Sequence, residues 1–306
     1  MPRVSIILPT YRRPGFLHSA ISSVLNQTFE DFELIVVDDA SGDNTGEIVG
    51  SFGDRRIRYV CLESNRGEAG ARNAGLMKLD PRAEFVAFLD DDDEWLPDKL
   101  RKQVEFMESA SSDIGCVYTG FYIVDAHTKR VIGKRLPSKR GDLYGELLVK
   151  NEVGTPSTVL LRRECIDRVG LFDEGISYGV DHDLWIRISK YFKFDFIEEA
   201  LVRYHIHEKR LSNDPYIVSK GFDDMLSKYG ISLLDLDRDY YGSRYLAMGV
   251  LFCLMGDMKR GIRCLLRALI LNPYNVRTYF YLALSFGGVN LFKKIRKLIE
   301  IRKLRS

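Results

Sequence analysis

The pattern of apolar and polar positions differs between the N-terminal and C-terminal parts of the chain. Up to about residue 124, short apolar runs rich in β-branched residues alternate with amphipathic stretches. This pattern predicts strands at Val4–Leu8, Phe32–Val37, Ile57–Leu62, Phe85–Leu89 and Ile114–Val124, with helices between them. Nearly continuous apolar strands that alternate with helices are typical of a mostly parallel sheet covered on both faces. We therefore predict an α/β fold for this part of the chain.

The pattern becomes helical toward the C-terminus. Residues 125–206 are mixed, and we expect strands at Ser157–Leu161 and Phe194–Ile197 and a helix from Val180 to about Tyr191. Beyond Asn213 the helical period dominates and predicts helices at Tyr216–Tyr229, Ser243–Met255, Lys259–Leu271, Val276–Phe286 and Leu291–Leu304. The sequence thus predicts an α/β domain over residues 1–212 and an α-helical C-terminal extension over residues 213–306.

Polar residues follow three of the predicted strands at the point where each strand ends. They are Pro9-Thr10-Tyr11, Asp38-Asp39-Ala40-Ser41 and Asp90-Asp91-Asp92-Asp93. In open α/β sheets, ligands bind beyond the carboxyl ends of the strands. We therefore expect these three segments to meet at one edge of the sheet and to form the functional site.

Four consecutive aspartates are the most unusual of these features. Carboxylates this close repel one another unless a cation neutralises them. Oxygen ligands suit Mg²⁺ or Mn²⁺, which keep coordination positions open for water and substrate phosphates. The alternative is a solvated acidic turn before the helix that starts near Pro97, where carboxylates interact favourably with the helix dipole.

The stretch Glu63–Gly75 combines small residues with an arginine near a predicted helix start. Small residues allow the backbone to approach a ligand closely, and the planar guanidinium of Arg72 can bind a diphosphate. The alternative is a surface helix in which glycine serves packing.

Three segments of the first forty-one residues resemble the nucleotide-sugar glycosyltransferases of family 2, which have the GT-A fold. They are Val4–Tyr11, Ser22–Phe29 and Glu33–Ser41, in the order and at the spacing of that family. The resemblance implies a Rossmann-like domain that transfers a sugar from a nucleotide-diphosphate donor, and UDP is the nucleotide we expect. It also implies a divalent metal, Mn²⁺ or Mg²⁺, and inversion at the anomeric carbon.

The resemblance assigns donor-side roles to particular residues. Those expected to bind the donor nucleotide are Pro9, Thr10, Tyr11, Asp39, Arg72, Asp90 and Asp91. Within this set, Asp39 reads the base, Arg72 contacts the diphosphate or base side, and Asp91 lies near the ribose. Asp90-Asp91-Asp92 corresponds to the family's DxD motif, so Asp92 is the expected metal ligand. His207 lies in a segment similar to the family's closing segment and is a second candidate ligand; His205 stands where arginine is usual.

The expected catalytic base is Asp181, in the run Gly179–Ile188 that resembles the family's base-bearing helix start. A carboxylate within hydrogen-bond reach can take the proton of an attacking acceptor hydroxyl. This chain has Val180 where the family usually has glutamate, so a common second carboxylate is missing. The alternative role for Asp181 is that of a helix N-cap. Gly154–Thr158 and Leu171–Glu174 resemble the acceptor-side segments.

The C-terminal extension carries a different pattern. Residues from Tyr245 to Pro273 fall at the spacing of a tetratricopeptide repeat, which implies a helix pair that packs on the enzyme or docks a protein partner. From Lys259 onward there are 12 basic residues and one acidic residue, and Leu291, Phe292, Ile295, Leu298 and Ile299 give the last helix an apolar face. This favours an anionic membrane surface and a lipid-linked or envelope glycan as acceptor. A solvated basic helix is the alternative, and no nucleic-acid-binding module accompanies the charge.

Composition narrows the location and the class. Five scattered cysteines without a pairing pattern predict buried thiols in a reducing compartment. With no signal-peptide pattern and no apolar stretch long enough to span a bilayer, we expect a cytoplasmic protein, at most peripheral on the membrane. Two other classes stay open: a catalytically silent glycosyltransferase-like module that docks proteins through its tail, and a nucleotidyltransferase, although the early basic loop that the latter requires is absent.

Overall fold

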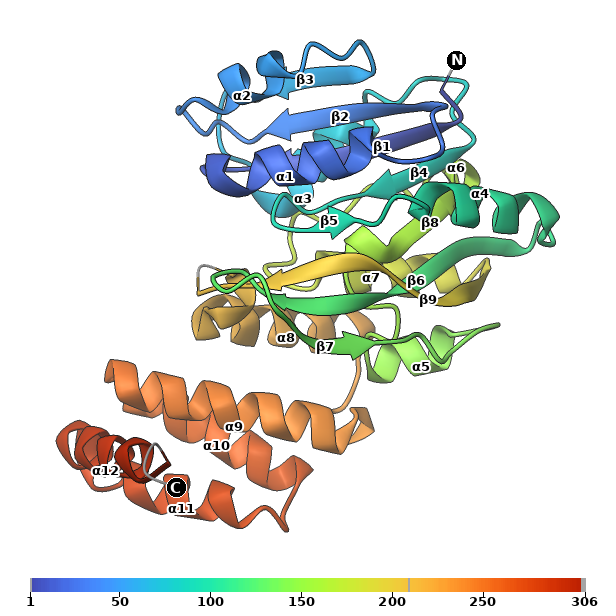
Figure 1. Ribbon diagram of the computed structural model, residues 1–306. Coiled ribbons are helices and arrows are strands. Elements are labelled where there is room, and N and C mark those ends of the chain that lie inside the picture. The colour runs from blue at the N-terminus through green and yellow to red at the C-terminus, as the bar shows by residue number, and fades with distance from the viewer. Residues whose placement is uncertain (1, 209, 304–306) are drawn as a thin grey trace. The chain divides into compact units, whose positions relative to one another are not determined.

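A computed structural model describes residues 2–208 and 210–303, with side-chain surroundings given through residue 297 (Figure 1). The chain divides into two compact units. Unit 1 comprises Met1–Leu147 and Asn151–Arg210, and unit 2 comprises Leu148–Lys150 and Leu211–Ser306. The predicted boundary after residue 212 lies two residues beyond this division.

Unit 1 is built on one nine-stranded sheet in the order β3-β2-β1-β4-β8-β6-β9-β5, with β7 paired to β6. The strands are β1 (Val4–Thr10), β2 (Phe32–Asp38), β3 (Ile57–Cys61), β4 (Phe85–Phe88), β5 (Glu94–Trp95), β6 (Ile114–Asp125), β7 (Val131–Arg135), β8 (Val159–Arg162) and β9 (Lys193–Ile206). β1 to β4 pair in parallel, β8 runs antiparallel to β4 and β6, and β9 runs parallel to β6. The predicted fold class is confirmed; the parallel part is the β3-β2-β1-β4 half, and the other half is mixed.

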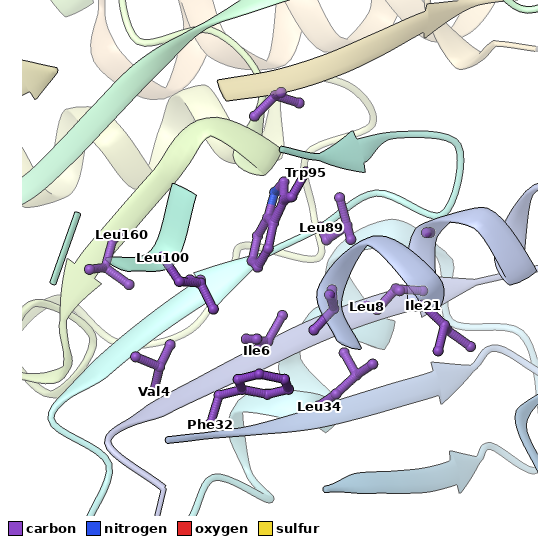
Figure 2. Close-up of a cluster of buried hydrophobic side chains, with 14 of the residues drawn as sticks. Val4, Ile6, Leu8, Ile21, Phe32, Leu34, Leu89, Trp95, Leu100 and Leu160 are labelled. Carbon is purple, nitrogen blue, oxygen red and sulfur yellow. The ribbon is translucent and has the colours of Figure 1, made fainter. Parts of the chain in front are cut away.

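Helices cover both faces of this sheet (Figure 1). They are α1 (Pro14–Leu25), α2 (Thr45–Ser51), α3 (Gly67–Leu76), α4 (Lys99–Ser109), α5 (Tyr144–Val149), α6 (Arg163–Val169) and α7 (Val180–Ser189), with a 3₁₀ turn, η1 (Pro156–Thr158), before β8. Side chains alternate along a strand, so Ile6 and Leu8 belong to the core that α1 and α4 cover (Figure 2). On the other face α3 lies so close that a Cβ at Gly75 would sit 2.6 Å from Cγ2 of Ile7.

The sequence pattern missed the strands that extend the mixed half of the sheet. β5 and β7 are not predicted, and β9 continues nine residues beyond the expected end at Ile197. The continuation of β9 was missed because the register of its pairing with β6 shifts: Thr119 pairs with Ile197, but Gly120 pairs with Ala200. The extra residues on β9 interrupt the alternation of apolar and polar positions on which strand prediction depends.

Unit 2 is helical and contains α8 (Pro215–Tyr229), α9 (Arg238–Met255), α10 (Met258–Leu271), α11 (Val276–Ser285) and α12 (Gly288–Lys303), with 3₁₀ turns η2 (Leu211–Asn213) and η3 (Leu233–Asp235). The predicted helices are confirmed, apart from Leu304, which lies outside the described residues. α9 and α10 form an antiparallel pair that glycine brings together, because a Cβ at Gly249 would lie 2.7 Å from Cγ of Leu265. The tetratricopeptide-like assignment of this pair stays a prediction.

The structure also bears on the expected burial of the cysteines and on membrane-spanning helices. Four cysteines are buried as predicted, but Cys61 is exposed, because it ends the edge strand β3. In the part of the chain that the structure describes, every helix is too short or too polar to cross a membrane.

Candidate active site

The three polar segments meet at one edge of the sheet, as the sequence predicts. Thr10 pairs with Asp38 at the carboxyl ends of β1 and β2, and the Asp39 N–H donates to the Thr10 carbonyl at 2.9 Å. The Thr10 hydroxyl donates to Asp91 Oδ2 at 2.8 Å across the edge. Parallel strands that end together therefore place the nucleotide-side candidates and the aspartate cluster side by side.

Asp91 and Asp92 share a cation that the sequence analysis did not single out. Arg13 Nη1 lies 3.1 Å from Asp91 Oδ1 and 2.9 Å from Asp92 Oδ2. His207 Nε2 lies 2.8 Å from the same Asp92 oxygen, and its ring stacks on Phe16. The predicted pair Asp92 and His207 is thus in direct contact, and the role of His207 as a ligand stays a prediction.

Asp90 and Asp93 complete a group of carboxylates around Asp92. Ligand atoms of Asp90, Asp92 and Asp93 all lie within 4.8 Å of one another. Asp93 is almost fully buried and accepts from the Ser157 hydroxyl at 2.6 Å. Burial raises the pKa of Asp90 and of Asp93, and it raises the pKa of Asp91 to about 7. Burial and the repulsion between neighbouring carboxylates both disfavour their charged forms, and a bound cation would offset both effects.

His205 contacts the backbone and a side chain of this aspartate group. Its Nδ1 lies 2.8 Å from the backbone carbonyl of Asp92, and its backbone N–H donates to Asp93 Oδ1 at 3.3 Å. Burial lowers its pKa, which favours the neutral ring. The end of β9 therefore helps to hold the aspartate loop in shape.

The remaining residues expected to bind the nucleotide differ in solvent exposure. Pro9 is the penultimate residue of β1, and the Tyr11 side chain is exposed after it. Asp39 is buried, and its carboxylate accepts from the backbone N–H groups of Arg66 and Gly67 at 2.7 and 2.9 Å, at the start of α3. Each carboxylate oxygen keeps a second lone pair, so this arrangement is compatible with a further N–H from a base.

Arg72 is less accessible than the sequence suggests. Its side chain is 1% exposed, and its guanidinium bonds to Glu68 Oε1 and Asp90 Oδ1, each at 2.5 Å. It also lies over the ring of Phe172. Its Nε is buried without a hydrogen-bond partner within the described residues. The predicted contact with the donor stays a prediction, and it requires a ligand oxygen to reach this Nε or to replace a carboxylate.

Asp181 lies in the first turn of α7, after Gly179, which is the N-cap and has φ of 81°. Asp181 is therefore not the N-cap. Within the described residues, the side-chain hydrogen bond to its carboxylate comes from Asn151 Nδ2 at 3.5 Å. Burial, with the nearby charge of Glu68, raises the pKa of Asp181 to about 7. Asp183, by contrast, pairs with Arg187 within the helix, as expected for a supporting residue.

Sequence reasoning missed Arg13 and Glu68 as site residues, and it gave Asp93 no role of its own within the run of four aspartates. Glu68 carries a usable signal, because a glutamate four residues before an arginine on a helix favours an ion pair. Arg13 carries none, since its partners Asp91 and Asp92 lie in the loop after β4, and the partners of Asp93, Ser157 and His205, are also distant in the sequence. Only the folded sheet brings them to the site.

A mixed sheet of this order with acidic residues beyond β2 and β4 defines a nucleotide-sugar transferase domain of the GT-A type. A model of glycosyl transferase family 2 matches residues 5–170, which is more than half of the 306 residues. The chain therefore belongs to glycosyl transferase family 2 and is a glycosyltransferase.

Relatives and solved structures agree with this assignment. The chain is 32% identical over 249 residues to the Escherichia coli UDP-Glc:alpha-D-GlcNAc-diphosphoundecaprenol beta-1,3-glucosyltransferase WfgD, covering 81% of this chain and 93% of that protein. It is 32% identical to the putative teichuronic acid biosynthesis glycosyltransferase TuaG of Bacillus subtilis, covering 72% and 85%.

Two solved structures share the fold at low sequence identity. S. aureus TarS 1–349 in complex with UDP-GlcNAc is 17% identical with a TM-score of 0.62, covering 98% of this chain and 92% of that chain. The mannosyltransferase PcManGT of Pyrobaculum calidifontis, in complex with GDP-Man and Mn²⁺, is 17% identical with a TM-score of 0.59, covering 95% and 86%.

Proposed function

We propose that this protein is an inverting, metal-dependent glycosyltransferase that moves a sugar from a UDP-sugar to a hydroxyl of a lipid-linked or envelope glycan. The observation that carries the proposal is one edge of the sheet that holds both a carboxylate group around Asp92 and a separate carboxylate, Asp181, with a raised pKa. The names of WfgD and TuaG support a lipid-linked or envelope acceptor, and TarS bound to UDP-GlcNAc supports a UDP donor.

The residues present fit a divalent metal. Asp90, Asp92 and Asp93 offer oxygen ligands close together, as Mg²⁺ and Mn²⁺ prefer, and a bound cation would offset the burial that raises the pKa of Asp90 and Asp93. Asp92, with His207 beside it, would hold the metal. The metal would supply Lewis-acid stabilisation of the charge on the departing nucleoside diphosphate.

The chain's own residues account for the remaining steps. Thr10, Asp39 and the start of α3 bind and orient the nucleotide at the ends of β1 and β2. Asp181 accepts the proton of the acceptor hydroxyl as its oxygen attacks the anomeric carbon, and the bond to the diphosphate breaks on the opposite face. A base that acts directly on the acceptor, without a covalent sugar–enzyme intermediate, gives inversion.

The surface of the helical extension is relevant to whether the protein meets its acceptor at a membrane. Part of the apolar face expected on α12 is used for packing, because Phe292 is buried with Val250, Leu265 and Leu284 and Ile295 packs against them, whereas Leu291 is exposed. Leu298 and Ile299 lie outside the described side chains. Lys293, Lys294 and Lys297 stay exposed, and Tyr274, in the turn between α10 and α11, is 92% exposed.

We propose that the exposed Lys293, Lys294 and Lys297 bring the protein to the cytoplasmic face of an anionic membrane, and that the exposed Tyr274 adds an aromatic contact with it. Docking of a protein partner at the same helices is the competing role. Binding to vesicles of phosphatidylglycerol but not of phosphatidylcholine supports the membrane. Equal failure with both refutes it.

The test of the proposed function is calorimetric and enzymatic. Wild type is titrated with UDP with and without Mn²⁺, beside Asp92→Ala, and UDP release is followed with UDP-glucose and α-D-GlcNAc-diphosphoundecaprenol. Metal-dependent UDP binding that the variant loses, with UDP released as sugar is transferred, supports the proposal. Release of pyrophosphate would point to a nucleotidyltransferase. Absence of nucleotide binding with UDP, GDP and dTDP would favour the silent docking module, which the intact carboxylates argue against.

A further inference from the structure

A basic segment without acidic residues runs from Ala126 to Gly141 in unit 1. It comprises the turn after β6, strand β7 and the chain that follows, and its lysines and arginines are Lys129, Arg130, Lys134, Arg135, Lys139 and Arg140. Arg140, beyond β7, pairs with Asp195 at 3.5 Å. The turn and the strand carry the other cations at the surface, and a local excess of positive charge attracts anions.

The turn after β6 lies at the same edge of the sheet as the aspartate cluster. β6 and β9 are parallel and end together. The Ala126 N–H donates to the Ile206 carbonyl at 3.0 Å, and the next residue, His207, contacts Asp92. From this turn β7 runs back antiparallel along β6. The basic hairpin therefore begins at the edge where the nucleotide and the metal are expected.

Arg135, the last residue of β7, reaches the loop beside Asp181. Its Nη2 donates to the backbone carbonyls of Asn151 and Glu152 at 3.4 and 3.2 Å, and the guanidinium lies over the ring of Phe121. Asn151 Nδ2 in turn donates to Asp181 at 3.5 Å. The side chain of Arg135 is 41% exposed. Within the described residues its hydrogen bonds use Nη2, so the Nε and Nη1 donors of the planar group can bind a ligand.

Apolar side chains are exposed beside these cations. Val131 is 58% exposed and Ile132 is 60% exposed, on an edge strand that pairs with β6 (Figure 1). An anionic head group with a hydrocarbon chain matches both kinds of side chain. In a lipid-linked sugar diphosphate, one sugar ring separates the attacking hydroxyl from the diphosphate, so the cation that binds the diphosphate must lie near the base without touching it. Arg135 meets this condition, because it and Asp181 both bond to Asn151.

We propose that the hairpin of β6 and β7 binds the diphosphate of a lipid-linked acceptor, with Arg135 as the direct contact. A planar guanidinium can bind two phosphate oxygens at once. The turn residues Lys129 and Arg130 add an attraction of longer range that salt screens. Val131 and Ile132 contact the start of the hydrocarbon chain. This inference rests on the proposed function and names the group of the acceptor that the protein binds.

The first test measures binding without donor or transfer. Phosphatidylcholine vesicles with and without undecaprenyl diphosphate are sedimented with the protein, beside phosphatidylglycerol vesicles. Arg135→Gln is expected to weaken binding to the diphosphate vesicles about 10-fold, because charge-assisted hydrogen bonds are lost, and to leave binding to phosphatidylglycerol unchanged. Equal weakening on both anionic vesicles would make the hairpin a general membrane surface and overturn the proposal. Wild type that binds both phosphatidylcholine preparations alike also overturns it.

The turn cations are tested by Lys129→Gln/Arg130→Gln. We expect diphosphate binding to weaken about 2- to 3-fold at low salt and to match wild type at high salt. Arg55→Gln/Lys78→Gln is the matched control, because both residues are exposed, before β3 and after α3, at the opposite edge of the sheet. An equal loss in this control counts against the hairpin. Thermal melting checks that all variants fold.

The second test separates a direct contact from support of the loop, because Arg135 also bonds the carbonyls of Asn151 and Glu152. Transfer from UDP-glucose is compared for α-D-GlcNAc-diphosphoundecaprenol and for octyl α-D-GlcNAc, which lacks the diphosphate. Arg135→Gln is expected to raise KM for the diphosphate acceptor about 10-fold and to leave KM for the octyl glycoside within about twofold. Arg135→Lys keeps the charge without the planar fork and should lie between Arg135→Gln and wild type.

Equal rises of KM for both acceptors would mean that Arg135 supports the loop only, and they overturn the proposal. Unchanged diphosphate binding in Arg135→Gln overturns it as well, and a change of oligomeric state in the ultracentrifuge would then assign the exposed edge to a second copy of the chain. Absence of transfer by wild type counts against the proposed function, while binding to the diphosphate vesicles still decides the inference.

Discussion

The two carboxylate regions of the site are held in opposite ways. Asp91 accepts through both oxygens, from Arg13 and Thr10, and Asp92 Oδ2 contacts both Arg13 and His207. Asp181, in the first turn of α7, receives a single long side-chain hydrogen bond at 3.5 Å within the described residues. A dense network suits carboxylates that hold a charge in place, and a sparse one suits a carboxylate that must accept and release a proton.

This difference predicts that mutations in the two regions affect different measurements, ligand affinity in one and turnover in the other. Changes in the Asp92 region should lower nucleotide and metal affinity together with turnover. Changes at Asp181 should lower turnover and leave the donor bound. Each prediction below tests one side of that separation.

The largest effect is expected from Asp92→Ala. Without this carboxylate the metal loses a ligand, and charge on the departing diphosphate loses its stabilisation, so kcat/KM should fall about 10³- to 10⁴-fold. Calorimetry should show that UDP binding no longer depends on Mn²⁺. A variant that keeps metal-dependent binding would place the metal elsewhere in the cluster.

Asp181→Asn should follow, with a fall in kcat of about 10²- to 10³-fold, the usual contribution of a general base. The amide keeps the shape of the side chain but cannot take the proton. UDP affinity with Mn²⁺ should stay within about twofold of wild type by calorimetry. A loss of UDP binding as large as the loss of turnover would break the comparison.

His207→Ala should lower Mn²⁺ affinity about 10-fold, measured by calorimetry in the presence of UDP, because it removes a neighbour that contacts Asp92 directly. His18→Ala is a suitable control, since His18 lies on α1 outside the cluster. Unchanged metal affinity in His207→Ala would make this histidine a lid residue only.

The smallest effect expected is that of pH. The pKa of Asp181 is raised to about 7, and the base must be ionised to act. We expect kcat/KM to fall about tenfold per pH unit below 7 and to level off above it. Because Asp91 also has a pKa near 7, the control is the residual activity of Asp181→Asn, which should lose this limb. A limb that survives in Asp181→Asn would belong to the cluster.

Much of the fold was readable from the sequence because it depends on local periodicity. The apolar runs that become β1, β2 and β4 are buried on both faces, so they appear as continuous hydrophobic stretches. Asp39 and the aspartates from Asp90 onward follow those runs directly, and parallel strands bring such residues to one edge. The helices of unit 2 were equally visible through their period.

The tertiary structure alone decided which of these residues meet. β9 pairs with β6 through a shifted register and also pairs with β5. The chain at its end brings His205 and His207 to Asp92, which lies 113 and 115 residues earlier. Arg13 reaches the same carboxylates from the turn after β1. The burial that raises the pKa of Asp181, and the place of Arg72 between Glu68 and Asp90, arise only when distant segments exclude water together. Periodicity is a property of neighbours along the chain, whereas pairing and desolvation depend on neighbours in space.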